Sequence, residues 1–163
     1  MSEIQFHDIK TLPKHVKIAI VISRFNNTLC QGLLRGAQEI LENAGLGPKQ
    51  VDTYWVPGAL EIPVTVKKLC QKKKVHAVIC LGCVIQGETA HFDYVCQGAL
   101  QGIAQLAQEF TIPILNGIIT AHTLEQAKDR SADPRVSKHG NIGAHAAQAC
   151  VEMVHLFQHL DLE

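Results

Sequence analysis

Four apolar runs rich in Val and Ile alternate along the chain with segments in which apolar residues recur every three or four positions. The runs have the length of strands, and the recurring pattern is typical of amphipathic helices. The predicted strands are Val16–Ser23, Val51–Val56, Ala77–Ile85 and Ile112–Thr120. The predicted helices lie near Asn27–Ala44, Ile62–Gln71, Ala90–Phe110, Leu124–Ser131 and 146–160. This alternation predicts an α/β fold with a parallel sheet and helices on both of its faces.

The loops that follow the predicted strands are the first place to look for a ligand. In sheets of this kind the ligand crevice lies beyond the carboxyl ends of the strands. Four segments follow those ends and are expected to meet: Ser23–Asn26, Val56–Ala59, Ile85–Glu88 and Thr120–His122.

The chain has the length of one domain, which we expect to span residues 1–163. Residues 1–15 are expected to form an extended arm that needs a partner to be ordered. Residues 132–141 combine Pro, Gly and charges of both signs, which indicates an exposed hinge between the last two helices.

Composition narrows the classes of partner. Lys plus Arg and Asp plus Glu balance at 15 each, so no basic surface argues for nucleic acid. No apolar run is long enough to span a membrane, and the N-terminus lacks the apolar stretch of a secretory signal. We therefore expect a cytoplasmic protein that binds neither nucleic acid nor membrane. Charged residues make up only 18% of the chain, which indicates a surface partly covered by other subunits.

Cys80 and Cys83 form a C-x-x-C motif, a spacing that metal and redox sites share. An odd spacing within one strand directs the two side chains to opposite faces of the sheet. We therefore interpret both cysteines as small apolar core residues.

The segment Gly82–Thr89 has the form G-x-x-x-x-G-E-T, a phosphate-binding loop with Glu88 at the lysine position. Without that lysine a triphosphate is disfavoured. A single phosphate could be held by backbone N–H groups at the helix start, by the Thr89 hydroxyl and by a cation from elsewhere. An ordinary strand-to-helix turn would carry the same local pattern.

His91 lies in the first turn of the following helix. The positive end of the helix disfavours a charged imidazolium, which leaves a neutral ring able to take up a proton. Phe25 directly follows the first strand, where an aromatic ring could stack on a planar substrate or pack in the core. His155 and His159 have a spacing that could chelate a metal, but no third ligand accompanies them, and we predict no metal site.

Five segments taken together closely resemble the lumazine synthase family. They are Ser23–Asn26, Pro57–Pro63, Gly87–Tyr94, Thr123–Ala127 and Lys138–Asn141. The resemblance covers nearly the whole chain in order, and the G-x-T-x-H-F-x-Y block after a strand is specific. It implies a flavodoxin-like, three-layer α/β/α sandwich with a four-stranded parallel sheet. The implied activity condenses 5-amino-6-(D-ribitylamino)uracil with 3,4-dihydroxy-2-butanone 4-phosphate, the penultimate step of riboflavin biosynthesis, without metal or organic cofactor.

The resemblance also implies roles for individual residues. His91 would move protons, and Glu88, Thr89 and Arg130 would hold the phosphate, although Arg135 or Lys138 could replace Arg130. The residues implied to bind the ribitylaminouracil are Phe25, Ala59, Leu60, Glu61, Cys83, Val84, Ile85 and, from an adjacent subunit, Asn116.

Two departures from the family pattern leave an alternative open. Ile142 stands where the family has a lysine near the substrates, and His145 stands where it has a carboxylate thought to assist the catalytic histidine. A catalytically weakened flavin or lumazine carrier, or a shell-forming paralogue, would also fit these changes.

The resemblance implies a homo-oligomer as well. Extra residues around Asp133–Val136 favour a pentamer over a sixty-subunit shell, and a decamer is a further alternative. The N-terminal arm would pair with a neighbouring subunit. Gly98 and Gly102 could serve close packing between subunits or packing of the helix against its own sheet. Whether a riboflavin synthase associates with the protein stays open.

Overall fold

A computed structural model describes residues 11–72 and 74–162, and its elements match those predicted from the sequence. The strands are β1 (Ile18–Ser23), β2 (Val51–Val56), β3 (Ala77–Ile85) and β4 (Ile114–Ala121). The helices are α1 (Asn27–Asn43), α2 (Ile62–Gln71), α3 (His91–Phe110), α4 (Leu124–Ser131) and α5 (Ile142–Leu160), with a 3-10 turn, η1 (Ala59–Glu61). The largest difference is the start of α5, which begins at Ile142 because Asn141 caps it.

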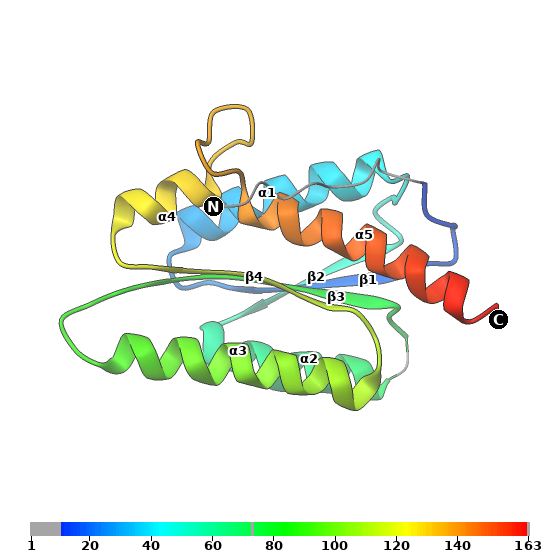
Figure 1. The fold of residues 1–163 in the computed structure, drawn as a ribbon, viewed down its shortest axis with the longest axis horizontal. Coiled ribbons are helices and arrows are strands. Elements are labelled where there is room, and N and C mark those ends of the chain that lie inside the picture. Colours follow the sequence, from blue (N-terminus) through cyan, green and yellow to red (C-terminus); the bar gives the residue numbers. More distant parts are fainter. Residues whose placement is uncertain (1–10, 73, 163) are drawn as a thin grey trace.

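The four strands form one parallel sheet in the order β2-β1-β3-β4, which confirms the predicted α/β architecture. Helices α1, α4 and α5 cover one face, and α2 and α3 cover the other (Figure 1). The chain adds β2 on one side of β1 and β3 on the other. In open sheets a ligand crevice forms at such a switch point, beyond the carboxyl ends of the two strands.

The central strands are buried on both faces, which explains their continuous apolar sequence. Along β1, Ile20 packs toward α1 and α5, and Val21 packs toward α2 and α3. Cys80 and Cys83 likewise belong to opposite cores, which confirms that they are separate apolar core residues. Burial raises the pKa of the Cys83 thiol to about 12, so it remains protonated at neutral pH.

Part of the predicted N-terminal arm packs against the chain itself. Leu12 is buried, and its N–H donates to the carbonyl of Ala44 at 2.9 Å. Leu12 therefore belongs to this chain's own core, whereas residues 1–10 of the predicted arm lie outside the described residues.

The segment 132–141 connects α4 to α5, as predicted, but it is not exposed throughout. Asp133 and Arg135 are exposed and paired with each other. Asn141, at the other end of the segment, is only 1% exposed. The prediction of an exposed hinge is therefore wrong for Asn141, which a local reading of polar residues could not place in the interior.

Candidate active site

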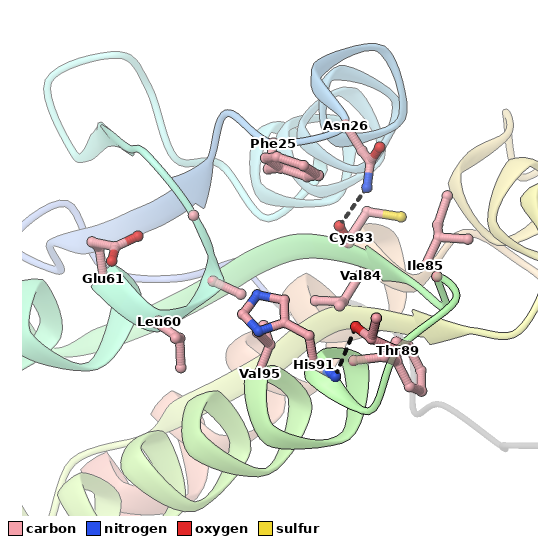
Figure 2. Close-up of a pocket in the computed structure, with 14 residues that line it drawn as sticks. Phe25, Asn26, Leu60, Glu61, Cys83, Val84, Ile85, Thr89, His91 and Val95 are labelled. Carbon is pink, nitrogen blue, oxygen red and sulfur yellow. Dashed lines mark hydrogen bonds between the residues drawn. The ribbon is translucent and has the colours of Figure 1, made fainter.

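A cavity of about 380 Å³ lies beyond the carboxyl ends of β1 and β3. It is mostly apolar, with a few polar groups directed into it, as ligand sites generally are. Figure 2 shows Leu60 and Glu61 on one flank, Cys83, Val84 and Ile85 on the other, and the His91 ring between them. The lining residues are Phe25, Asn26, Gly58, Ala59, Leu60, Glu61, Cys83, Val84, Ile85, Gly87, Thr89, His91, Phe92 and Val95.

The turn after β1 holds an aromatic ring at the mouth of the cavity. Asn26 has a left-handed backbone (φ 57°), which Asn adopts more readily than most residues. Its Nδ2 donates to the carbonyl of Cys83 at 2.9 Å and so fastens the turn to β3 (Figure 2). Phe25 remains 71% exposed, although solvent exposure of such a ring is unfavourable. The ring is thereby available to stack on a planar ligand.

The β3 wall of the cavity follows from strand register. The pairing of β1 with β3 ends at Ile22 and Leu81, whereas the pairing of β3 with β4 continues to Ile85 and Ala121. Residues 83–85 therefore extend past the end of β1. Their backbone edge on that side faces the cavity, where it can bond to a ligand in place of a strand.

The opposite wall is η1, which packs closely on α3. A Cβ added at Gly98 would lie 2.9 Å from Leu60, and one added at Gly102 would lie 2.7 Å from Pro63. Both glycines therefore let α3 approach η1 and α2 of the same chain, and not the sheet against which they were predicted to pack. Leu60, which is 48% exposed, is thereby held at the cavity edge.

The turn that opens α3 forms the end of the cavity. Ala90 is the N-cap residue and no side chain caps the helix, although the Thr89 Oγ1 accepts from the N–H of His91 at 3.4 Å. The turn is exposed from Gln86 to His91. An uncapped helix start carries unsatisfied N–H groups and partial positive charge, which together favour an anion.

His91 projects its ring from this first turn into the cavity (Figure 2). Val95 lies one turn further along the same face of α3 and lines the cavity as well. An imidazole next to an anion seat and across from an exposed aromatic ring can exchange protons with a ligand held between them.

Three predicted site residues lie outside this cavity. Glu88 is exposed on the turn between two lining residues, Gly87 and Thr89. Asn116 is exposed on the edge strand β4, where its Oδ1 accepts from the N–H of Ile118 at 3.0 Å. Arg130 lies on α4, across the sheet from α3, and its Nη1 donates to the carbonyl of Gln126 at 3.3 Å.

Arg135, the predicted alternative to Arg130, is already engaged. Its Nε and Nη2 donate to the two carboxylate oxygens of Asp133 at 2.8 and 2.6 Å. Lys138, the other alternative, is exposed on the same segment, and its backbone N–H donates to Asp129.

Five lining residues were not predicted from the sequence: Asn26, Gly58, Gly87, Phe92 and Val95. Val95 could have been found from its spacing of four from His91. Gly58 and Gly87 lie within segments expected to meet at the strand ends. The contact from Asn26 to Cys83 joins positions 57 residues apart, and no local pattern indicates it.

The positions that depart from the family pattern also lie away from the cavity lining. Ile142 and His145 belong to the first turns of α5, on the opposite face of the sheet from α3. Burial lowers the pKa of His145. Neither residue is among those that line this chain's cavity.

Two further observations concern metals and membranes. Across residues 11–72 and 74–162, no three His, Cys, Asp or Glu side chains gather closely enough to hold a metal ion. In the same part of the chain, no helix combines the length and the apolar character needed to cross a membrane.

Comparison with known proteins gives three findings. A family model described as 6,7-dimethyl-8-ribityllumazine synthase matches residues 15–158. A 6,7-dimethyl-8-ribityllumazine synthase from Leuconostoc mesenteroides subsp. mesenteroides is 42% identical over 144 residues, covering 88% of this chain and 90% of that protein. A crystal structure of a GDP-L-fucose synthetase from Naegleria fowleri bound to NADP aligns with a TM-score of 0.41 and 13% identity. That alignment covers 96% of this chain and 51% of the synthetase, so this chain spans about half of its length.

Proposed function

The chain belongs to the 6,7-dimethyl-8-ribityllumazine synthase family, and we propose how its cavity performs the family's reaction. The protein is a transferase that condenses 5-amino-6-(D-ribitylamino)uracil with 3,4-dihydroxy-2-butanone 4-phosphate to give 6,7-dimethyl-8-ribityllumazine, the penultimate step of riboflavin biosynthesis. One observation in particular supports this cavity as the active site. An exposed aromatic ring, an imidazole and an uncapped helix start all border the same space.

The pyrimidine binds between Phe25 and the walls of the cavity. Its planar ring stacks on the Phe25 side chain, which is otherwise exposed at the mouth. Residues Ala59, Leu60 and Glu61 bind the uracil and the ribityl chain from η1. The backbone edge of Cys83, Val84 and Ile85 supplies hydrogen bonds, as an added strand would.

The phosphate of the second substrate binds at the start of α3. Backbone N–H groups at Glu88 and Thr89, the Thr89 hydroxyl and the helix dipole favour its negative charge. The Glu88 carboxylate would repel an anion, so this residue contributes through its backbone. Arg130 clamps the phosphate and balances its charge.

His91 exchanges protons during the condensation. The 5-amino group of the uracil attacks the ketone and forms an imine with loss of water. Removal of a proton from the butanone carbon chain then expels phosphate, and ring closure with loss of a second water completes the lumazine. A positioned imidazole can accept and return these protons, which typically contributes 10²–10⁴-fold in rate. Alignment of the two substrates contributes the rest.

The complete site is shared between two subunits of a homo-oligomer, which we take to be a pentamer. Arg130 and Asn116 lie outside this chain's cavity and so act on the cavity of a neighbouring subunit. Within this assembly residues 1–163 act as one domain.

A condensation assay tests the proposal. The protein is mixed with both substrates, and lumazine absorbance and phosphate release are followed together. We expect both to rise at equal rates, well above the uncatalysed background. A rate equal to the background would support the alternative of a lumazine carrier, whose tight binding of lumazine without turnover could be measured by fluorescence quenching.

A further inference from the structure

The register of β3 and β4 places two polar side chains next to each other beyond the ends of these strands. The last pair in the register is Ile85 with Ala121, and the N–H of Gln86 donates to the carbonyl of Ala121 at 2.9 Å. Gln86 and His122 are thus the next residues of each strand and project to the same face. This face is the one covered by α3, because Val84 and Ile118 on it belong to the core beneath α2 and α3.

His122 contacts three segments at once. Its Nδ1–H donates to Oε1 of Gln86, in the turn that leads to α3. Its ring centroid lies 5.9 Å from that of Phe92, in the first turn of α3. Its backbone N–H donates to Oε1 of Gln126 at 3.0 Å, and Gln126 also belongs to the capping box at the start of α4.

Two of these segments belong to the proposed phosphate site of this chain: the turn after Gln86 would receive the phosphate, and Phe92 follows His91 and lines the cavity. The third, α4, carries Arg130, which is proposed to act on a neighbouring subunit's cavity. The turn itself is exposed and has no side-chain cap, so the contacts from His122 add to the hydrogen bond between Thr89 and His91 within it. A site of this kind binds well only if its N–H groups are already in place.

We propose that His122 is a positioning residue for the phosphate site, and that it holds the β3–α3 turn in its anion-binding conformation through Gln86 and Phe92. This role rests on the proposed function and adds to it a residue that is absent from the cavity lining. Its loss removes one hydrogen bond and one ring contact from the turn, so we expect phosphate affinity to fall by about three- to tenfold.

The test compares His122→Ala with His122→Asn in the intact oligomer. His122→Ala should raise KM for the butanone phosphate about three- to tenfold and leave KM for the pyrimidine within about twofold. His122→Asn should recover only part of the lost affinity, because an Asn amide can replace the Nδ1–H donor toward Gln86 but not the ring contact with Phe92. His159→Ala, at the far end of α5, is the matched control and should leave both KM values unchanged.

Gln86→Ala provides a second route if His122→Ala folds poorly. It should reproduce the part of the rise in KM for the butanone phosphate that comes from the hydrogen bond, and the double variant should be no worse than His122→Ala alone. Equal changes in both KM values, a fall in kcat alone, or additive effects of the two substitutions would each overturn the positioning role.

Calorimetric titration with inorganic phosphate separates this inference from the proposed function. If the wild-type protein binds phosphate but does not catalyse the condensation, weaker binding by His122→Ala still supports the inference while the function fails. If the wild type is active and His122→Ala binds phosphate equally well, the inference fails and the function stands.

Discussion

The start of α3 and the start of α5 differ in how their backbone N–H groups are satisfied. Both are helix N-termini with backbone N–H groups that have no partner within the helix. At α5 the Asn141 side chain fills this end: Oδ1 accepts from the N–H of Ala144 at 3.0 Å. At α3 the N-cap is Ala90, which has no side-chain acceptor to offer.

Burial accounts for the difference between the two ends. Asn141 is 1% exposed, and its Nδ2 lies within 3.1 Å of the carbonyl oxygens of Gly32, Ser131 and Ala132. Asn141 thus joins α1, α4 and α5. The turn before α3 is exposed, so water can satisfy its N–H groups until a ligand replaces it. A helix start that is capped by a buried side chain stabilises the fold, whereas an exposed start without such a cap can bind a ligand.

The largest expected effect is on kcat, after a substitution at the start of α3. His91→Ala should lower kcat by about 10²–10⁴-fold, the contribution that a positioned general acid/base typically makes. The free energy of unfolding should change by no more than about 0.5 kcal/mol, since the side chain is exposed. Steady-state kinetics and urea unfolding check the two halves of this prediction. An unchanged kcat would remove His91 from its proposed role.

The second-largest effect is expected at the start of α5, where the substitution should lower the stability of the fold. Asn141→Ala should lower the free energy of unfolding by about 3 kcal/mol, because it removes the cap and leaves buried carbonyl groups without their donor. Urea unfolding measures this loss. Asn43→Ala, at an exposed position at the end of α1, is the control and should stay within about 0.5 kcal/mol of wild type. A loss as small as that of the control would mean that the junction is not held by Asn141.

The phosphate bound at the start of α3 also needs a cation from elsewhere in the protein, and Arg130 is the proposed one. Arg130→Ala should raise KM for the butanone phosphate by about 10–100-fold, with little change in KM for the pyrimidine. Arg135→Ala is the matched control, because that guanidinium already pairs with Asp133. If Arg135→Ala gave the larger rise in KM, the phosphate clamp would be assigned to the wrong arginine.

The tight packing around Asn141 gives a smaller, coupled effect. A Cβ added at Gly36 would lie 2.3 Å from Oδ1 of Asn141. Gly36→Ala should therefore destabilise the protein by about 2 kcal/mol. In the Asn141→Ala background the obstacle is gone, so the same substitution should have almost no effect. Additive losses in this double-mutant cycle would contradict the contact.

The same comparison explains what the sequence could predict. Strands and helices follow from local periodicity, so their order and the parallel sheet were predicted correctly. The residues from Cys83 to Ile85 and those in η1 were predicted to line the pocket through family resemblance, and the cavity includes them. Asn141 was predicted to be exposed as part of a segment that combines Pro, Gly and charges of both signs. Its burial depends on three backbone carbonyls from two other segments, which sequence spacing cannot show.

Arg130 and Asn116 illustrate a second limit. Their local context correctly predicts a capped helix and a strand, and the capping box of Thr123 and Gln126 is present as expected. Neither residue reaches this chain's own cavity. A role that depends on a neighbouring subunit is set by the geometry of assembly, which is encoded in surfaces and not in the periodicity of single elements.

The smallest expected effect concerns stability and the segment 132–141, which leads into α5. Arg135 lowers the pKa of Asp133 to about 2, from an ordinary value of 3.8, first by its side-chain hydrogen bonds and then by its backbone N–H. A carboxyl group with a lowered folded-state pKa stabilises the fold above its unfolded pKa, and this contribution is lost as the pH falls through the folded value. Asp133→Asn should therefore be less stable than wild type at pH 7, and the difference should disappear between about pH 4 and pH 2.

Urea unfolding at pH 7, 4 and 2.5 measures this convergence, with Asp161→Asn beyond the end of α5 as the control. The Asn141→Ala loss should persist across the same range, because neither its amide nor the carbonyls it joins titrate there. A loss for Asp133→Asn that stayed constant down to pH 2.5 would show that the segment is held by packing and not by its ion pair. The pH dependence thus separates the exposed, charged approach to α5 from the buried, neutral junction that closes it.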